Sequence, residues 1–273
     1  MASCLPESIE TEVEQAESKM VVSSQILLNG IIVVALTRSF SALEGSFDGE
    51  ITEEILDKIL VKKARVVLSY HGKNDTLFQI GNQPGFYTGF IANLQDGDQM
   101  QLEIYDSVSN QTVVATSTQL PSVALNSISI KAKSNNSSII DTTFILNYNF
   151  TDRPERNWYV LSLVNPNEIG NASNPFLGQA STNSYTELIS DLAYNDPNIS
   201  VETELPGYQM ADTMVVMFTN ISEDYFKYLD ARRRGGGIIS SLTGEPINHP
   251  TNVVGGYGFF NANRPQFMSV FVE

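Results

Sequence analysis

Short runs of β-branched and aromatic residues, separated by turn residues at intervals of roughly ten, most constrain how this chain can fold. The first two, MVVSSQI (20–26) and IIVVALTRS (31–39), flank an Asn29-Gly30 pair. Asn-Gly favours a tight hairpin because both central residues adopt positive φ. Similar runs follow at 64–70, 75–80, 85–91, 99–106 and 112–120. This spacing predicts an all-β sandwich, which makes the fold class mainly β.

Pro121, in LPSVAL (120–125), marks a break before a second β-rich region. Residues 165–208 are rich in Asn, Pro, Ser and Gly, so they predict mostly loop with a short helix near YTELISDLAY (185–194). Further strand-like runs occupy 127–133, 141–150, 157–164 and 212–220, and the chain closes with a glycine-bent strand, a turn at 263–265 and a last strand. We expect an acidic tether at 1–19, an N-terminal β-sandwich domain at 20–122 and a C-terminal β-rich domain at 123–273.

Two segments have helical periodicity. ITEEILDKILVKK (51–63) places Ile55 and Ile59 on one stripe after Thr52, a suitable N-cap. SEDYFKYLDARRRGGG (222–237) begins with Ser222, carries acidic residues in its first turn and ends in three arginines, as the helix dipole favours. The arginines and glycines could also bind an anion. Phosphate loops place their glycines before a helix, however, so helix termination is the better interpretation.

Charge and cysteine content exclude several classes of protein. The chain has 16 basic and 31 acidic residues and a net charge of −15, so a phosphate backbone would be repelled and no nucleic-acid partner is expected. No segment approaches the roughly 20 apolar residues of a membrane-spanning helix. With a single cysteine the chain forms no internal disulfide, and its hydrophobic core must hold the fold.

The sequence nominates no catalytic residue and no cofactor. His71 and His249 lack a second histidine or a cysteine at ligand spacing, so neither predicts a metal site. Asp96-Gly97-Asp98 is either part of a calcium loop or a tight turn, and the turn is favoured because the full calcium pattern is absent. There is no Gly-x-Ser-x-Gly motif. A pair of glycosidase carboxylates stays open among the many acidic residues.

Three aromatic residues, Trp158, Tyr257 and Phe259, are candidates for stacking on a sugar ring or a partner protein. Aromatic residues at alternating strand positions more often pack in a core, so core packing is the alternative interpretation for each.

Cys4, the only cysteine, lies in the acidic lead MASCLPESIETEVEQAESK, outside any periodic segment. The letters ASC match the end of a bacterial lipobox, in which small residues precede a lipidated cysteine. We therefore expect Cys4 to carry a lipid anchor and the glutamates through Glu17 to keep the tether solvated. The charged and apolar parts of a signal peptide are missing before Cys4, so we expect a trimmed sequence or a misassigned start.

Three longer motifs follow one another along the chain: FTDRPERNWYVLSLV (150–164), FTNISEDYFKYLDA (218–231) and EPINHPTNVVGGYGFFNA (245–262). In these motifs and their order the chain resembles the Bacteroidetes lipoprotein family called domain of unknown function 4249. The runs VVSSQI, VALTRS, ARVVLSY, PGFYTG, LEIYD and ATSTQLP extend this resemblance over about 20–273. The 51–63 helix departs from the family pattern, as does NVVGGYG, where an Asn-Ile step is more usual.

The resemblance implies an outer-membrane lipoprotein with an N-terminal immunoglobulin-like or carboxypeptidase-regulatory-like β domain, often found beside TonB-dependent transporters. It supplies no catalytic residues. We therefore expect a non-enzymatic, lipid-anchored envelope protein, with an acidic tether similar to a surface-export signal. It would bind a glycan or peptide ligand, or a partner such as a TonB-dependent transporter, in nutrient uptake. The alternatives are a fimbrillin-like structural or adhesive subunit and a glycan-acting hydrolase.

Overall fold

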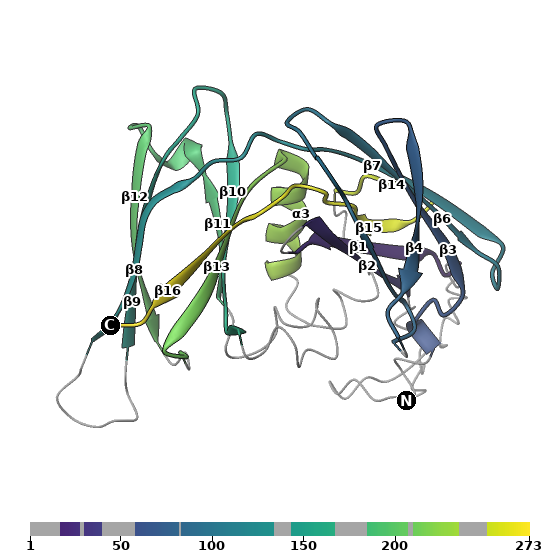
Figure 1. Ribbon diagram of the computed structural model, residues 1–273, viewed down its shortest axis with the longest axis horizontal. Helices are drawn as coiled ribbons and strands as arrows, with labels where there is room; N and C mark the ends of the chain where they lie inside the picture. The colour runs from purple at the N-terminus through teal and green to yellow at the C-terminus, as the bar shows by residue number, and fades with distance from the viewer. Residues whose placement is uncertain are drawn as a thin grey trace, which may run out of the picture.

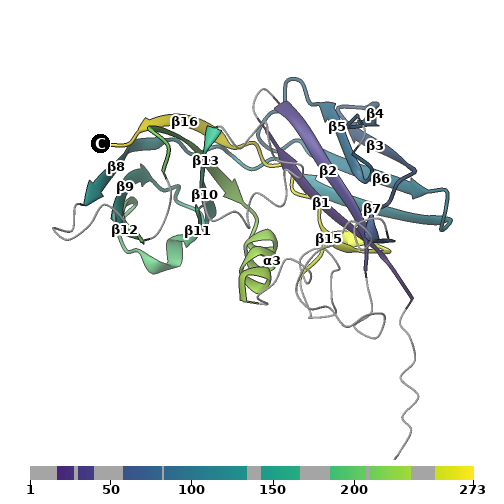
Figure 2. The same ribbon diagram turned by 90° about the horizontal axis from the view of Figure 1, so that it is seen from below.

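The computed structural model is mainly β with one α-helix, as the sequence predicted, and contains two β units with the helix α3 (Glu223–Arg234) between them (Figures 1 and 2). The structure describes residues 17–27, 30–39, 58–81, 83–133, 143–166, 185–206, 210–234 and 250–273. Statements about the structure below concern these residues. A linker through Pro121 connects the two units.

The first unit is a nine-stranded sheet with the order β14-β7-β6-β3-β4-β5-β2-β1-β15. Seven strands come from the N-terminal half: β1 (Met20–Ile26), β2 (Ile31–Arg38), β3 (Ala64–Tyr70), β4 (Lys73–Gln79), β5 (Phe86–Phe90), β6 (Gln99–Asp106) and β7 (Gln111–Thr118). Alternate residues of these strands face one core, including Val22, Val34, Leu68, Leu102 and Ile104. The predicted strand runs and the β1–β2 hairpin pairing are present.

The two edges of this sheet are joined by a short segment from near the C-terminus. β14 (Val253–Val254) pairs with β7, and β15 (Tyr257–Phe259) pairs in parallel with β1. Gly255 and Gly256 make the corner between them, and a Cβ added to Gly256 would lie 2.5 Å from the Met20 carbonyl oxygen. Glycine is therefore required where the segment crosses from one edge to the other. The result is a nearly closed sheet rather than an open sandwich with free edges.

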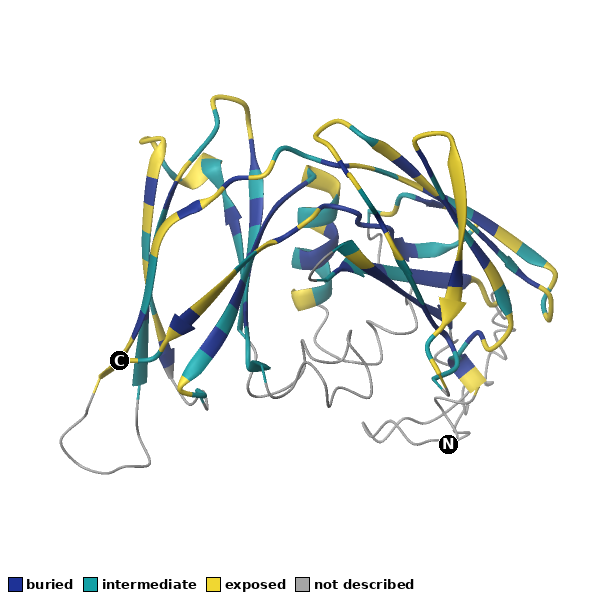
Figure 3. Cartoon of the chain, viewed as in Figure 1, coloured by how far each residue is buried: buried dark blue, intermediate teal, exposed yellow. Residues whose placement is uncertain are grey.

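The second unit packs a four-stranded sheet, β11-β10-β13-β16, against a three-stranded sheet, β12-β9-β8. Its strands are β8 (Leu125–Lys133), β9 (Thr143–Thr151), β10 (Trp158–Val164), β11 (Tyr185–Ser190), β12 (Asn198–Pro206), β13 (Thr213–Ile221) and β16 (Gln266–Phe271). Buried residues alternate with partly buried ones along β9, β10 and the first part of β13 (Figure 3). The rings of Phe150, Tyr159 and Phe218 meet at the centre, with centroids 4.9 to 5.3 Å apart.

The prediction of loop with a short helix over 165–208 is wrong for its described part. Residues 185–190 form β11, a single 3₁₀ turn spans Asp191–Ala193, and β12 follows. Ile189, Ile199 and Leu205 are buried in the core of the second unit. Burial of these side chains on strand positions outweighed the loop-like composition around them.

The helix predicted over 51–63 lies partly outside the described residues, and its end is wrong. Lys58 and Ile59 are helical, but Leu60 bridges to Thr37 and Val61 N donates to the Leu36 carbonyl at 3.1 Å. The chain there is extended along β2.

The second predicted helix is confirmed as α3, with Ser222 Oγ accepting a hydrogen bond from Tyr225 N at 3.2 Å. The glycines that we expected to end it, 235–237, lie outside the described residues. The expected domain division between residues 122 and 123 falls between β7 and β8 and stays a prediction, and β14 and β15 return from the later part of the chain to the first sheet.

Candidate functional site

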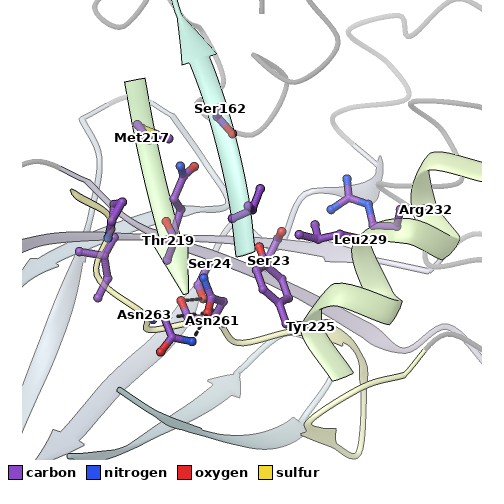
Figure 4. A pocket seen from close by; sticks show the side chains of 14 residues that line it. Ser23, Ser24, Ser162, Met217, Thr219, Tyr225, Leu229, Arg232, Asn261 and Asn263 are labelled. Carbon is purple, nitrogen blue, oxygen red and sulfur yellow. Dashed lines mark hydrogen bonds between the residues drawn. The ribbon is translucent and has the colours of Figure 1, made fainter. Parts of the chain in front are cut away.

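A cleft lies at the junction of the two units, where β1, β10, β13, α3 and the segment 261–265 meet (Figure 4). We call it the junction cleft, and its volume is about 50 Å³. Polar groups reach it from all of these segments: Ser23, Gln25, Ser162, Thr219, Arg232 and Asn263. The space accommodates a small polar group, such as a hydroxyl or carboxylate carried by a larger partner.

The first wall of the junction cleft is fixed by hydrogen bonds between β1 and the returning segment. Ser24 Oγ donates to the Asn261 carbonyl and accepts from Asn261 N, both at 2.8 Å. Asn263 Nδ2 donates to Asn261 Oδ1 at 2.8 Å, and Asn263 Oδ1 accepts from Leu120 N at 2.7 Å. These side chains are buried and paired, so this wall is rigid.

A second asparagine holds the returning segment to β7. Asn252 Nδ2 donates to the carbonyls of Phe260 at 2.8 Å and Thr116 at 2.7 Å, and Asn252 Oδ1 accepts from Phe260 N at 2.8 Å. One side chain thus satisfies three backbone groups beside a glycine-bent strand. Asn252 and Asn261 both lie in the family-like motif at 245–262, so these hydrogen bonds give asparagines of that motif a structural role.

The second wall is the outer face of the four-stranded sheet together with one face of α3. Ser162 lies opposite Met217, and Val160 lies opposite Thr219, while the residues between them point into the core. Tyr225, Leu229 and Arg232 follow at helical spacing, so they share one face of α3. The Arg232 guanidinium carbon lies 5.5 Å from the Tyr228 ring centroid, a cation–π contact that orients the charge.

An aromatic cluster beside the junction cleft attaches α3 to both units. Phe259 of β15 lies 4.9 Å from Tyr225 and 5.6 Å from Tyr228, measured between ring centroids. Trp158 of β10 packs against the same cluster. Burial raises the pKa of the Tyr225 hydroxyl, which keeps this group neutral at physiological pH. The first unit therefore contributes an aromatic side chain to the packing of the helix.

The structure thus brings together two of the three aromatic candidates. Phe259 is buried and Trp158 is half-buried in this cluster, while Tyr257 lies apart with Lys19 Nζ 5.2 Å from its ring centroid. None of the three lines the junction cleft. Cys4 and His249 lie outside the described residues, so the lipidation of Cys4 stays a prediction.

The family-like motif at 150–164 spans the end of β9, a loop and β10, and its polar residues hold the loop. Tyr159 Oη donates to Asp152 Oδ1 at 2.5 Å, and burial followed by this carboxylate raises the pKa of Tyr159. Asn157 Nδ2 donates to the Glu155 carbonyl, and Asn157 N donates to Asp191 Oδ2 at 2.6 Å. Asp152 and Asn157, two polar residues of this motif, therefore both have hydrogen-bond partners within the protein.

Asp96-Gly97-Asp98 forms a turn, in agreement with the favoured interpretation. Gly97 has a φ of 88°, and Asp98 N donates to the Gln95 carbonyl at 3.1 Å. Asp98 Oδ2 lies 2.7 Å from His71 Nε2 and accepts from Gln95 N at 2.6 Å. Among the described residues, no group of three or more His, Cys, Asp or Glu side chains could hold a metal ion.

Sequence reasoning missed the polar residues of the junction cleft. Ser23 and Gln25 lie two residues apart in β1 and therefore share one face of the strand, and that spacing was the available signal. This signal indicated that the two polar side chains point out of the sheet, but it did not indicate which part of the protein they would face. The lining side chains donate and accept hydrogen bonds and include one guanidinium, but no carboxylate, histidine or cysteine. Their chemistry suits the binding of a polar or anionic group.

Fold and cleft together define a two-unit β protein with a polar cleft at the junction of its units. The family model described as Domain of unknown function (DUF4249) matches residues 6–265, and the chain belongs to this family. No curated protein matches the sequence. No helix in the described part of the chain has both the length and the apolar character needed to cross a membrane.

Two solved structures show remote similarity. The chicken CNTN1 FN1-FN3 domains are 10% identical, and the match covers 93% of this chain and 67% of that one with a TM-score of 0.26. The BSP domain of a biofilm-associated protein is 10% identical, with 74% of this chain and 55% of that one covered and a TM-score of 0.21. At these TM-scores neither match supports a functional argument.

Proposed function

We propose that this protein is a non-enzymatic cell-envelope lipoprotein that binds a ligand or partner protein in association with a TonB-dependent nutrient uptake system. Its first unit would be an immunoglobulin-like or carboxypeptidase-regulatory-like module. One observation carries the binding role: five separate segments bring hydroxyl, amide and guanidinium groups to the junction cleft. A cation held against an aromatic ring, beside hydroxyls on paired strands, is a prepared site for a polar or anionic group.

The envelope location rests on Cys4 and on the family resemblance. A cysteine carrying several acyl chains would anchor the protein in the outer membrane, because each buried CH₂ contributes about 0.8 kcal/mol and one chain alone binds only marginally. The acidic tether would then hold both β units away from the membrane surface. Its acidic residues just after Cys4 resemble a surface-export signal, which would place the protein on the outer face of the outer membrane.

The edges of the first sheet favour this binding role over a fimbrillin-like one. A fimbrillin-like subunit would need a vacant strand position for a neighbouring chain to fill. β14 and β15 of the same chain occupy both edges of the nine-stranded sheet. A glycan-acting hydrolase would need two facing carboxylates, and among the described residues the side chains that line the junction cleft contain none.

The lipid anchor is tested by labelling cells that make the native protein with a radioactive fatty acid. The full-length protein should be labelled, Cys4→Ala should not, and Ser8→Ala in the same tether should be labelled like the wild type. Equal labelling of the wild type and Cys4→Ala would refute the anchor.

The partner is tested by purifying the tagged protein from detergent-solubilised outer membranes and measuring the amount of a TonB-dependent transporter that accompanies it. Arg232→Ala removes the charge from the junction cleft and should release the transporter. Arg233→Ala is the matched control, because Arg233 is exposed and pairs with Asp230 at 3.0 Å on the same helix. Absence of a transporter from the wild-type sample, or equal amounts with both variants, would contradict the proposal.

A further inference from the structure

A second concave site lies on the outer face of the first sheet, over β3, β6 and β7. Its volume is about 390 Å³, and we call it the sheet groove. Small-molecule sites in proteins usually measure about 300–1,000 Å³. In Figure 1 these strands lie at the end of the molecule opposite β8, β9 and β12, so the second unit does not cover them.

The floor of the sheet groove is a regular array of hydroxyl and amide side chains. Ser69 of β3 lies opposite Gln101 of β6, and Gln101 lies opposite Thr116 of β7. One row along, Gln99 lies opposite Thr118. Adjacent strands are about 4.8 Å apart, so these side chains present donors and acceptors at that spacing.

The opposite faces of the same strands explain why this array is ordered. Leu68, Leu102 and Ala115, each next in sequence to a floor residue, are buried in the core of the first unit. Their burial fixes the register, and a shift by one residue would exchange the apolar and polar faces. The polar array therefore keeps its geometry without a ligand.

One wall of the sheet groove is a histidine held in an uncommon backbone conformation. His71 has a φ of 49° and Gly72 a φ of 71°, in the two-residue turn between β3 and β4. Positive φ is uncommon for a residue other than glycine. Asp98 holds the imidazole, with Oδ2 2.7 Å from Nε2, while half or more of each side chain is covered by the protein. The turn directs a positioned imidazole toward the groove's lining.

The groups that are left free to bind determine the class of ligand. The backbone of β6 is paired on both sides, with β3 and with β7, so it cannot receive an extended peptide as an additional strand. A ligand must therefore be recognised by side chains, and those on the floor of the groove both donate and accept hydrogen bonds. His71, which lines the groove, is already paired with the Asp98 carboxylate, and the chain's net charge of −15 repels polyanions.

We propose that the sheet groove binds a neutral saccharide. A saccharide carries closely spaced hydroxyl groups that both donate and accept hydrogen bonds, so it complements the floor of the sheet groove without carrying a net charge. The site is separate from the junction cleft and does not depend on the role proposed for that cleft.

The test begins with the purified full chain on an array of neutral and acidic oligosaccharides, followed by calorimetric titration with the saccharide that gives the strongest signal. The double variant Gln101→Ala/Thr116→Ala should weaken binding about tenfold or more, because two side-chain hydrogen bonds are lost. Both side chains are exposed, so the variant should retain its fold, and circular dichroism checks this.

Thr76→Ala is the matched control. Thr76 is exposed on β4 opposite Val67, on the same outer face but outside the groove lining, and its removal should leave affinity unchanged. Arg232→Ala should also bind the saccharide normally, which separates this site from the junction cleft. The proposal is overturned if no neutral saccharide binds, if only acidic saccharides bind, or if the folded double variant binds as tightly as the wild type.

Discussion

Ser24 and Asn261 exchange two hydrogen bonds of 2.8 Å across 237 positions of sequence. The pair lies directly beyond the last backbone pairing of β1 with β15, at Ser23 and Phe259. A serine hydroxyl thereby continues the attachment of the returning segment for one more residue. Both groups are buried, so the contact depends on each partner being present.

Ser24→Ala should lower the free energy of unfolding by about 1–3 kcal/mol, because Asn261 N and its carbonyl lose their hydroxyl partner in a buried position. Urea unfolding followed by circular dichroism measures the change. Ser23→Ala, on the opposite face of β1, should change stability by less than about 0.5 kcal/mol. A Ser24→Ala variant as stable as Ser23→Ala would contradict this role for the hydroxyl.

Gly258→Ala should be among the most damaging single substitutions in the chain. Gly258 has a φ of 89°, and an added Cβ would lie 2.0 Å from the Val22 carbonyl oxygen. Gly97 has nearly the same φ, 88°, with no atom within 4 Å of an added Cβ. Gly97→Ala should therefore show only the backbone strain, about 1–2 kcal/mol, and Gly258→Ala that strain plus displacement of β1.

Thermal unfolding of the two glycine variants compares these costs directly. The expected result is a fall in Tm several times larger for Gly258→Ala than for Gly97→Ala, since a 1 kcal/mol loss shifts Tm by about 2–4 °C in a chain of this size. Equal shifts would show that close packing against Val22 contributes nothing.

Asp106 should make stability depend on pH in the acid range. Its carboxylate is fully buried and accepts hydrogen bonds from Ser109 Oγ at 2.6 Å, Val108 N at 3.0 Å and the Arg38 guanidinium. Burial alone would raise its pKa, but these bonds together hold the pKa below the ordinary value of 3.8. A lowered folded-state pKa contributes stability above the unfolded-state pKa, and that stability is lost as pH falls through the folded-state value.

Asp106→Asn should therefore be less stable than the wild type at pH 7, by about 1–3 kcal/mol. The difference should begin to shrink as pH falls below about 4, the unfolded-state value, and should be lost as pH falls through the lowered folded-state pKa. Urea midpoints at pH 7 and near pH 3 test this. Glu103→Gln, which removes an exposed 3.3 Å pair with Arg65, should cost no more than about 1 kcal/mol at pH 7. A pH-independent Asp106→Asn effect would contradict the assignment.

The N-cap of α3 gives a local test of the helix at the junction. Ser222→Ala removes the acceptor for Tyr225 N and should cost about 1 kcal/mol, whereas Ser222→Asp should retain most of the stability because Asp also caps. Chemical unfolding measures both variants. If Asp is as harmful as Ala, the serine acts through packing rather than through capping.

Local patterns were sufficient to predict most of the strands and the capped helix. A run of β-branched residues near an Asn-Gly pair marks β1, apolar alternation marks β6, and Ser222 followed by two acidic residues marks the start of α3. The pattern failed between 185 and 206, where polar turn residues concealed the buried positions of β11 and β12. It also failed after Ile59, where pairing with β2 outweighed helical periodicity.

The returning segment and the junction cleft could not be predicted from local patterns. The glycines before Tyr257 indicated a bend, but no local signal shows that β15 would pair in parallel with β1. The cleft depends on the same long-range contact, since Asn263 reaches it only after that pairing forms. Phe259 illustrates the limit: its aromatic character suggested either core or ligand contact, and only tertiary packing places it against α3.

The position of β15 has a consequence for the order in which the protein is made. β1 ends at Ile26, whereas its neighbour in the sheet begins at Tyr257, so the first unit cannot close until nearly the whole chain has left the ribosome. Such distant pairing makes folding slow. Closure of the first unit is therefore a late step that follows synthesis of nearly the whole chain.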